Sequence, residues 1–180
     1  MRVITGSAKG AKLLSIEGTD TRPTLDRIKV TMFDLIPDTF YNKNCLDLFS
    51  GSGALGIEAL SRGARKCEFV EQNLECVKII KENLKHTKLE DKASINNTEV
   101  DKALLMFTNR EKFDMIFMDP PYDKGLVNKA IESILKLDLL NDDGLIIAEC
   151  GENEKIESNE VEIIKERTFK KMSLYILGKK

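Results

Sequence analysis

The sequence has little of what metal sites, disulfide frameworks and membrane spans require. Its 180 residues include one histidine and four cysteines, and the cysteines lie far apart with no C-x-x-C pair. This spacing argues against a zinc site and favours reduced, buried thiols, so we expect no metal. No stretch approaches the roughly 20 apolar residues that span a bilayer, and residues 1–10 lack the apolar core of a secretory signal. We therefore expect a cytoplasmic protein with no membrane partner.

A large excess of charge of one sign is also missing. The chain has 28 basic and 30 acidic residues, a formal net charge of −2, which excludes nucleic-acid binding through the overall field alone. The first 29 residues depart from this balance, since six basic side chains oppose three acidic ones there. Such a segment can follow a phosphate backbone, or it can be a solvated face with structural ion pairs. Its basic residues are Arg2, Lys9, Lys12, Arg22, Arg27 and Lys29.

What the sequence does contain is an alternation of apolar runs and helical patterns. Strands are predicted at 45–49, 67–71, 93–97, 113–118 and 145–148, with helices between them at 54–62, 74–84, 103–107 and 126–135. This alternation predicts an α/β fold with a mostly parallel sheet and helices on both faces. Two further runs, at 161–165 and 174–177, predict a terminal antiparallel pair.

The N-terminal region predicts an extension on this core. Apolar residues flank a glycine-containing turn at 6–10, which indicates a β-hairpin, and a helical pattern follows at 25–36. We expect a basic hairpin-and-helix extension over residues 1–43 and an α/β core domain over residues 44–180.

A glycine-rich turn follows the first strand of the core. Residues 47–56 read DLFSGSGALG and contain G-x-G-x-x-G between a strand and a helix, which lets the backbone approach a ligand closely. Glu71 lies 20 residues beyond Gly51, where a carboxylate can accept hydrogen bonds from ribose hydroxyls. Asp47 beside the loop suits a cationic ligand better than a pyrophosphate. The cofactor that fits is S-adenosylmethionine (AdoMet), which carries a sulfonium and an amino group and no phosphate.

The tetrapeptide Asp119-Pro120-Pro121-Tyr122 follows the fourth strand, where open α/β sheets bind ligands. Two prolines stiffen the loop and leave carbonyl groups free to face a substrate. Asp119 can accept a hydrogen bond from an NH₂ group, and Tyr122 can stack on a planar base. These residues suit methylation of an exocyclic amine, because hydrogen bonds to the NH₂ would direct its lone pair and stabilise the charge that develops on nitrogen.

Together, the string DLFSGSGALGIEALSRGA, the F-V-E run and D-P-P-Y resemble the class I AdoMet-dependent methyltransferases. The opening MRVITGSAKG and the string TRPTLDRIK at 21–29 resemble more closely the RsmD-type family, which methylates N2 of a guanine in small-subunit (16S) ribosomal RNA. The resemblance covers essentially the whole chain. It implies a Rossmann-like fold with a mostly parallel seven-stranded sheet, and ribosomal RNA as the partner. Because a mildly acidic protein of this size has little surface for RNA alone, we expect a monomer that acts on a 30S subunit or an assembly intermediate.

The resemblance also implies roles for individual residues. Asp119, Pro120, Pro121 and Tyr122 would hold the target guanine, and Glu71 would bind the AdoMet ribose. One of Asn97, Thr98 and Glu99 would contact the adenine, and the sequence does not rank them. The remaining residues expected to line the AdoMet site are Asp47, Phe49, Gly51, Gly53 and Gly56.

Other functions fit parts of the same pattern. An amino-methylase acting on DNA adenine N6 or cytosine N4 uses a similar loop, but 180 residues leave little room for a target-recognition region. Protein glutamine methylases typically carry Asn where this chain has Asp119. A non-catalytic RNA-binding assembly factor would not need both loops, and a nicotinamide dehydrogenase gives no reason for D-P-P-Y.

Overall fold

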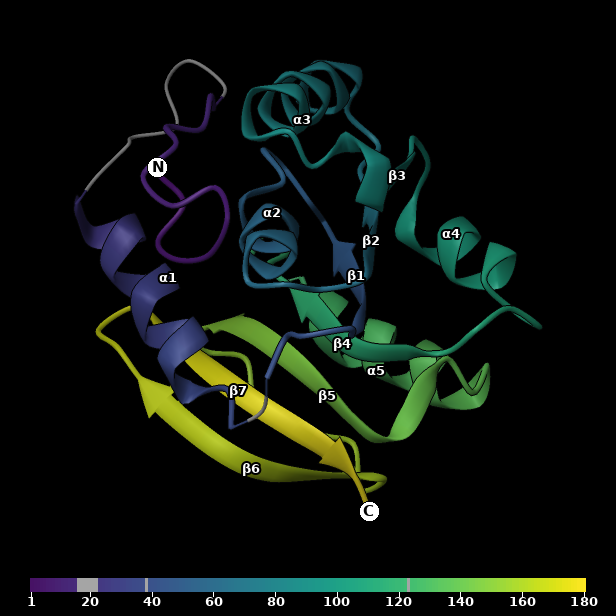
Figure 1. Ribbon diagram of the computed structural model, residues 1–180. Coiled ribbons are helices and arrows are strands. Elements are labelled where there is room, and N and C mark those ends of the chain that lie inside the picture. The colour runs from purple at the N-terminus through teal and green to yellow at the C-terminus, as the bar shows by residue number, and fades with distance from the viewer. Residues whose placement is uncertain (16–22, 38, 123) are drawn as a thin grey trace.

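The computed structural model describes residues 1–15, 23–37, 39–122 and 124–180, and for 23–25 only the backbone. It forms one seven-stranded sheet with helices on both faces (Figure 1). The elements are α1 (Pro23–Leu35), β1 (Asn44–Leu48), α2 (Ala54–Ser61), β2 (Lys66–Val70), α3 (Leu74–Thr87), the 3₁₀ helix η1 (Glu90–Lys92), β3 (Ala93–Asn96), α4 (Val100–Met106), β4 (Phe113–Met118), α5 (Leu126–Lys136), β5 (Leu140–Gly151), β6 (Val161–Thr168) and β7 (Met172–Lys179).

The strand order in the sheet is β3-β2-β1-β4-β5-β7-β6. The first five strands pair in parallel, whereas β7 pairs antiparallel with both β5 and β6. The mostly parallel sheet and the terminal antiparallel pair predicted from the sequence are therefore confirmed. Because the chain leaves β1 in one direction towards β2 and returns on its other side as β4, the carboxyl end of β1 is a topological switch point, where such sheets bind ligands.

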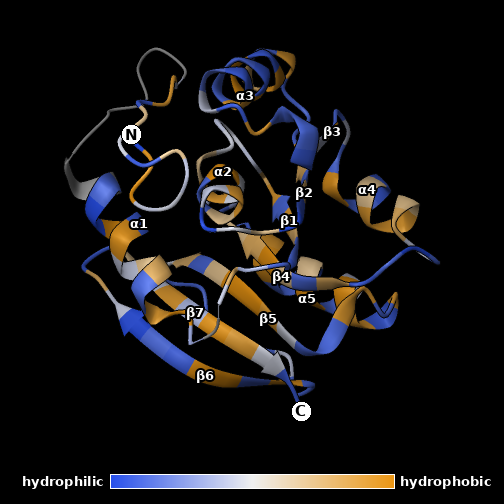
Figure 2. Cartoon of the chain, in the orientation of Figure 1, coloured by the Kyte–Doolittle hydropathy of each residue, from blue (hydrophilic) through white to orange (hydrophobic). Residues whose placement is uncertain are grey.

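Alternate residues of the central strands pack into two hydrophobic cores, one on each face of the sheet. On β1, Cys45 packs with the α1, α2 and α3 side, and Leu46 packs with the α4 and α5 side. Figure 2 shows the resulting concentration of hydrophobic residues in the central strands, while the edge strand β6 is mostly hydrophilic. A polar edge discourages pairing with other chains. In the part of the chain described here, no helix combines the length and apolar character needed to cross a membrane.

The N-terminal region is less regular than the predicted hairpin. Two flanking strands are absent from its described residues, which contain a single antiparallel bridge between Arg2 and Lys12. Val3 and Leu13 nevertheless belong to the same core as the sheet. In Figure 1 this segment and α1 lie beside α2, away from α4 and α5. The extension and the α/β core thus share one hydrophobic interior.

A buried carboxylate holds the extension against α2. Glu58 accepts hydrogen bonds from the backbone amides of Ile4 (2.8 Å) and Thr5 (3.1 Å) and from the Nε of Arg62 (2.9 Å). Its other charged partner is the Lys29 ammonium on α1, at 3.2 Å. Glu58 therefore joins the N-terminal segment, α1 and α2 at one point.

Candidate active site

The candidate site lies at the carboxyl ends of β1, β2 and β4. Asp47 on β1 pairs in register with Phe69 on β2 and with Phe117 on β4. The residues that follow these three strands, the glycine loop, Glu71 and Asp119, therefore meet at one edge of the sheet. The topology alone brings together the three motifs that the sequence singled out.

The glycine loop is held by hydrogen bonds within the protein. The buried Asp47 accepts from the Gly56 amide (2.9 Å), and the Ser50 hydroxyl donates to the Asp47 carbonyl (2.6 Å). The Gly51 amide donates to Glu71 (2.8 Å), and the Gly53 amide donates to the Ser50 carbonyl (2.7 Å). The loop is therefore rigid, and its amides at Gly51 and Gly53 are already engaged.

The three glycines of the motif do different things. Gly51 has a φ of 53°, and a Cβ built on it would meet nothing within 4 Å, so this residue opens onto the site. A Cβ on Gly53 would approach Ile80 and Phe69 at 3.3 Å, and one on Gly56 would reach the Phe69 ring at 2.4 Å. The side on which Gly53 and Gly56 would carry a side chain is therefore filled by the core, and contact of their backbone with the cofactor stays a prediction. Their role is close helix-to-sheet packing.

Glu71 is preorganised at the end of β2. One carboxylate oxygen accepts from the Gly51 amide and the other from the Asn73 amide, both at 2.8 Å. These bonds fix the carboxylate and leave further lone pairs on each oxygen for a ligand. A ribose with two adjacent hydroxyls is a suitable donor for this arrangement.

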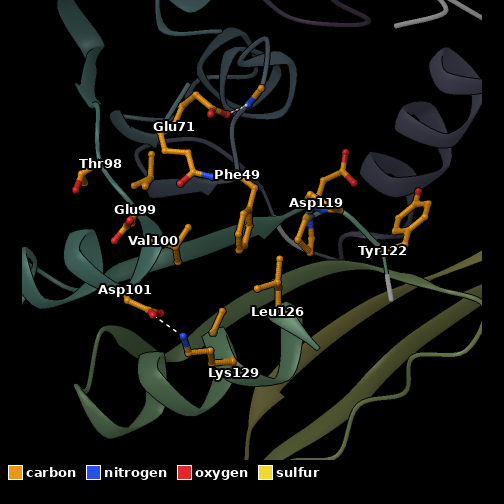
Figure 3. A pocket seen from close by; sticks show the side chains of 16 residues that line it. Phe49, Glu71, Thr98, Glu99, Val100, Asp101, Asp119, Tyr122, Leu126 and Lys129 are labelled. Carbon is orange, nitrogen blue, oxygen red and sulfur yellow. Dashed lines mark hydrogen bonds and ion pairs between the residues drawn. The ribbon is translucent and has the colours of Figure 1, made fainter. Parts of the chain in front are cut away.

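A cavity of about 600 Å³ opens beside Glu71 (Figure 3). Thr98 and Glu99 line it, whereas the Asn97 amide turns away to donate to the carbonyls of Glu71 (2.9 Å) and Gln72 (3.1 Å). The structure thus distinguishes Asn97 from Thr98 and Glu99, three candidates for the adenine contact that the sequence did not rank. Other lining residues were not predicted; they are Val70, Gln72, Val100, Asp101, Leu126, Lys129 and Ala130. Helical periodicity marked Leu126 and Ala130 only as core residues, because it does not show which part of a helix borders a cavity.

Asp119 stands on the opposite side of this cavity from Glu71 and Thr98, next to Tyr122 (Figure 3). Its side chain is exposed to the cavity, yet the surrounding protein displaces enough water to raise its pKa to about 6. Asp47 shares the acidic environment, since burial and the charges of Asp119 and Glu71 raise its pKa well above the usual range. The site therefore concentrates negative charge and favours a cationic ligand.

A second, smaller cavity of about 250 Å³ adjoins the first and is also lined by Asp119. Both cavities are lined by Phe49, Gly51, Asp119 and Tyr122. The smaller one is also bordered by Asp47, by Glu149 and by residues of the extension, including Met1, Lys29 and Met32. Asp119 consequently stands where two binding spaces meet.

Glu149 on β5 is a site residue that sequence reasoning missed. It is buried and accepts a hydrogen bond from the Tyr122 hydroxyl. Burial and the Asp119 charge together raise its pKa to about 8. An acid directly after the apolar run 145–148 was a signal that could have indicated a site position.

The basic residues of the extension divide into two groups. Arg2, Lys9, Lys12 and Arg27 are exposed, as contact with a phosphate backbone requires. Lys29 is not: it is 3% exposed, and its ammonium donates to the Arg2 carbonyl (2.7 Å) and pairs with Glu58. Lys29 is therefore a structural ion-pair residue beside the smaller cavity and not the surface RNA contact that was expected. Arg22 lies outside the described residues.

The cysteines and other potential ligands form no cluster that suggests a metal. Cys45, Cys67, Cys76 and Cys150 are buried and unbridged. Among the described residues, no group of three or more His, Cys, Asp or Glu side chains could hold a metal ion. The carboxylates of the site are instead spread along the two cavities.

Comparison with known proteins agrees with this geometry. The family model described as "Conserved hypothetical protein 95" matches residues 1–178. The chain is 42% identical over 150 residues to YlbH of Bacillus subtilis, covering 83% of this chain and 82% of that protein. It is 34% identical over 171 residues to "Ribosomal RNA small subunit methyltransferase D" of Haemophilus influenzae, covering 93% and 88% of the two chains.

Solved structures show the same relationship. The structure of yhhF from Escherichia coli superposes with a TM-score of 0.87 at 27% identity, covering 100% of this chain and 98% of that one. The match therefore includes the N-terminal extension as well as the sheet. With the family model, the relatives and the fold in agreement, the chain belongs to the RsmD-type family of class I methyltransferases.

Proposed function

We propose that this protein transfers a methyl group from AdoMet to the exocyclic N2 amine of a guanine in small-subunit (16S) ribosomal RNA. The observation that carries the proposal is the position of Asp119. Its carboxylate is exposed where the two cavities meet, at the end of β4 and beside the glycine loop. A hydrogen-bond acceptor at such a junction can hold an amine next to a bound methyl donor.

The residues present fit AdoMet. Glu71 and the neighbouring Thr98 and Glu99 suit the ribose and adenine in the larger cavity. Asp47 in the smaller cavity suits the α-amino group. When bound, AdoMet supplies an electrophilic methyl group on a sulfonium, and the carboxylates Asp47, Glu71 and Asp119 complement that cationic ligand.

A dinucleotide cofactor fits less well. Pyrophosphate binding at a glycine loop relies on free backbone amides at the start of the helix. Here the Gly51 amide is engaged by Glu71 and the Gly53 amide by the Ser50 carbonyl. An anionic pyrophosphate would also lie close to Asp47 and Glu71, which argues against a nicotinamide dehydrogenase.

The chain's own residues account for activation of the amine. An exocyclic amine is a weak nucleophile because its lone pair is delocalised into the ring. Asp119 and the Pro120 carbonyl would accept hydrogen bonds from the NH₂ group, directing its lone pair and stabilising the positive charge that develops on nitrogen. Tyr122 offers an aromatic face, 40% exposed, on which the base can stack.

The substrate assignment rests on the extension and on the relatives. Arg2, Lys9, Lys12 and Arg27 present exposed positive charge for a phosphate backbone. Relatives that include the Haemophilus influenzae protein carry the name of a small-subunit ribosomal RNA methyltransferase. Because a mildly acidic chain offers little surface for RNA alone, we propose that a monomer acts on RNA within a 30S subunit or an assembly intermediate.

The test is transfer of radiolabelled methyl from AdoMet to unmodified small ribosomal subunits, naked small-subunit RNA and duplex DNA, with nucleoside analysis of the product. Label in N2-methylguanosine from either ribosomal substrate is the expected result. Label only in DNA would overturn the substrate and leave the amine chemistry in place. Absence of AdoMet binding would favour a non-catalytic assembly factor on this fold.

A further inference from the structure

The Tyr122 side chain is held at both of its ends. Its backbone follows Pro120 and Pro121, whose rings restrict the loop, and its hydroxyl donates to the Glu149 carboxyl. Between these two points the ring lines both cavities and remains 40% exposed. An exposed aromatic ring with a fixed backbone and a tethered hydroxyl is a rigid surface for a planar ligand.

Glu149 has an environment that is unusual for an acid. It is 6% exposed and follows the apolar β5 residues Ile147 and Ala148. No ion pair to Glu149 occurs in the described part of the chain, and its hydrogen bond there is the one from Tyr122. Burying an acid without a cation costs stability, so its presence beside the site favours a functional role.

We propose that Glu149 is a positioning residue for methyl transfer, which holds the Tyr122 ring in the orientation on which the target base stacks. The inference rests on the proposed function, because it needs a base at this site. Enzymes that act on a base grip it between aromatic or apolar side chains and hydrogen bonds to its edge. Tethering the ring in advance reduces the ordering that binding would otherwise require.

The hydrogen bond from Tyr122 to Glu149, the proposed tether, also affects how the ring is placed relative to Asp119. Asp119 and Tyr122 are three residues apart in one loop, and both border the two cavities. If Glu149 fixes the ring, it fixes the plane of the stacked base and hence the position of the base's amine relative to the Asp119 carboxylate. A misplaced base should bind and react slowly, so we expect the effect in kcat more than in AdoMet affinity.

A first test needs no substrate. The groups that act on Tyr122 are Glu149, Asp119 and Cys150, and Glu149 itself has a pKa of about 8. In protein labelled with ¹³C at the tyrosine ring carbon that bears the hydroxyl, the Tyr122 signal should shift with a midpoint near pH 8. The chain has three tyrosines, so a Tyr122→Phe spectrum assigns the signal.

In Glu149→Gln, the shift near pH 8 should disappear, while a smaller one near pH 6 from Asp119 should remain. Glu152→Gln is the matched control, because Glu152 is an exposed acid shortly after Glu149 in the chain, and its spectrum should match wild type. A Tyr122 signal that still titrates near pH 8 in Glu149→Gln would overturn the proposed tether.

A second test uses a double-mutant cycle in methyl transfer. Glu149→Leu, which has no acceptor for the Tyr122 hydroxyl, and Tyr122→Phe should each lower kcat about tenfold, the scale of a lost hydrogen bond between neutral groups. Since each removes the same interaction, the double variant should be no worse than either single variant. Multiplied losses in the double variant, or full activity in Glu149→Leu, would contradict the positioning role.

The two proposals can fail separately. If the wild-type protein labels a base amine other than guanine N2, the proposed substrate is wrong, but the same cycle tests the tether on the base that is labelled. If no acceptor is found, the titration of the Tyr122 signal still decides whether Glu149 controls the ring.

Discussion

At the scale of single residues, Asp119 combines two properties that usually exclude one another. It is exposed to the cavity, yet its pKa is raised to about 6, against roughly 3.9 for a free aspartate. The carboxylate form is the one that accepts hydrogen bonds from an amine. Its protonation therefore removes the proposed contact just below neutral pH.

We expect Asp119→Ala to lower methyl transfer by about 10²–10³-fold, as for other deleted transition-state hydrogen bonds. The affinity for AdoMet, measured by calorimetry, should stay nearly unchanged, because Glu71 and the glycine loop remain. In the wild-type protein, kcat should fall as the pH drops through about 6. Loss of AdoMet binding in the variant would mean that Asp119 holds the cofactor and not the base.

The residue scale also shows where sequence reasoning stops. Asp47, Glu71 and Asp119 were predictable because Asp47 interrupts an apolar run just before the glycine loop, and Glu71 and Asp119 stand at the ends of two others at the same edge of a parallel sheet. Lys29 was misassigned because its charge is visible in the sequence, while its burial against Glu58 depends on how α1 packs. Glu149 was missed because its partner Tyr122 is 27 residues away.

At the scale of elements, α2 joins the glycine loop to the sheet. Its first turn contains Gly56, whose missing side chain lets the helix contact Phe69 and Cys67 on β2. The periodicity predicted this helix and the strands on either side of it. It could not predict how closely they approach, because that distance depends on side chains from both elements.

Gly56→Ala should therefore destabilise the protein. The new Cβ would lie 2.4 Å from the Phe69 ring and 2.8 Å from the Cys67 sulfur, and overpacking of this kind costs about 1–3 kcal/mol. Urea unfolding should show a lower midpoint with an unchanged slope.

Phe69→Leu supplies the control, since a smaller side chain should relieve the clash. The double variant Gly56→Ala, Phe69→Leu should be more stable than the sum of the two single effects predicts. Simple additivity would contradict a steric origin for the Gly56 requirement.

At the scale of the whole molecule, the extension is integrated with the catalytic core. Glu58 joins the N-terminal segment, α1 and α2, and Phe33 of α1 stacks on Phe117 of β4 with ring centroids 5.6 Å apart. The sequence indicated a separate basic extension from its charge. Its shared core could not be anticipated, because the contacts of Ile4 and Thr5 with Glu58 link residues more than 50 positions apart.

Glu58→Gln should loosen this junction. The variant leaves the buried Lys29 ammonium without its counter-charge, and breaking a buried ion pair costs about 3–5 kcal/mol. We expect a lower urea midpoint and faster proteolysis within residues 1–43. Glu111→Gln is the matched control, because Glu111 is an exposed acid paired with Arg65 and Lys66, and such surface pairs contribute about 0–1 kcal/mol. Equal effects of the two variants would show that Glu58 holds nothing specific.

The distribution of exposed charge over the molecule gives the last prediction. Arg2 and Arg27 are exposed on the extension, which reaches the smaller cavity through Met1 and Lys29. If they contact phosphates, Arg2→Ala with Arg27→Ala should weaken RNA binding and reduce its dependence on salt, by roughly one unit of slope for each lost contact.

The control variant is Lys92→Ala with Lys136→Ala, which removes the same charge from η1 and α5. These positions precede β3 and β5 and so lie towards the opposite edge of the parallel sheet. That control should keep the wild-type slope, because a whole-molecule field would respond equally to both pairs, whereas a local binding surface responds only to the first. If RNA binding by the two variants depended equally on salt, Arg2 and Arg27 would be ordinary solvated surface residues and not RNA contacts.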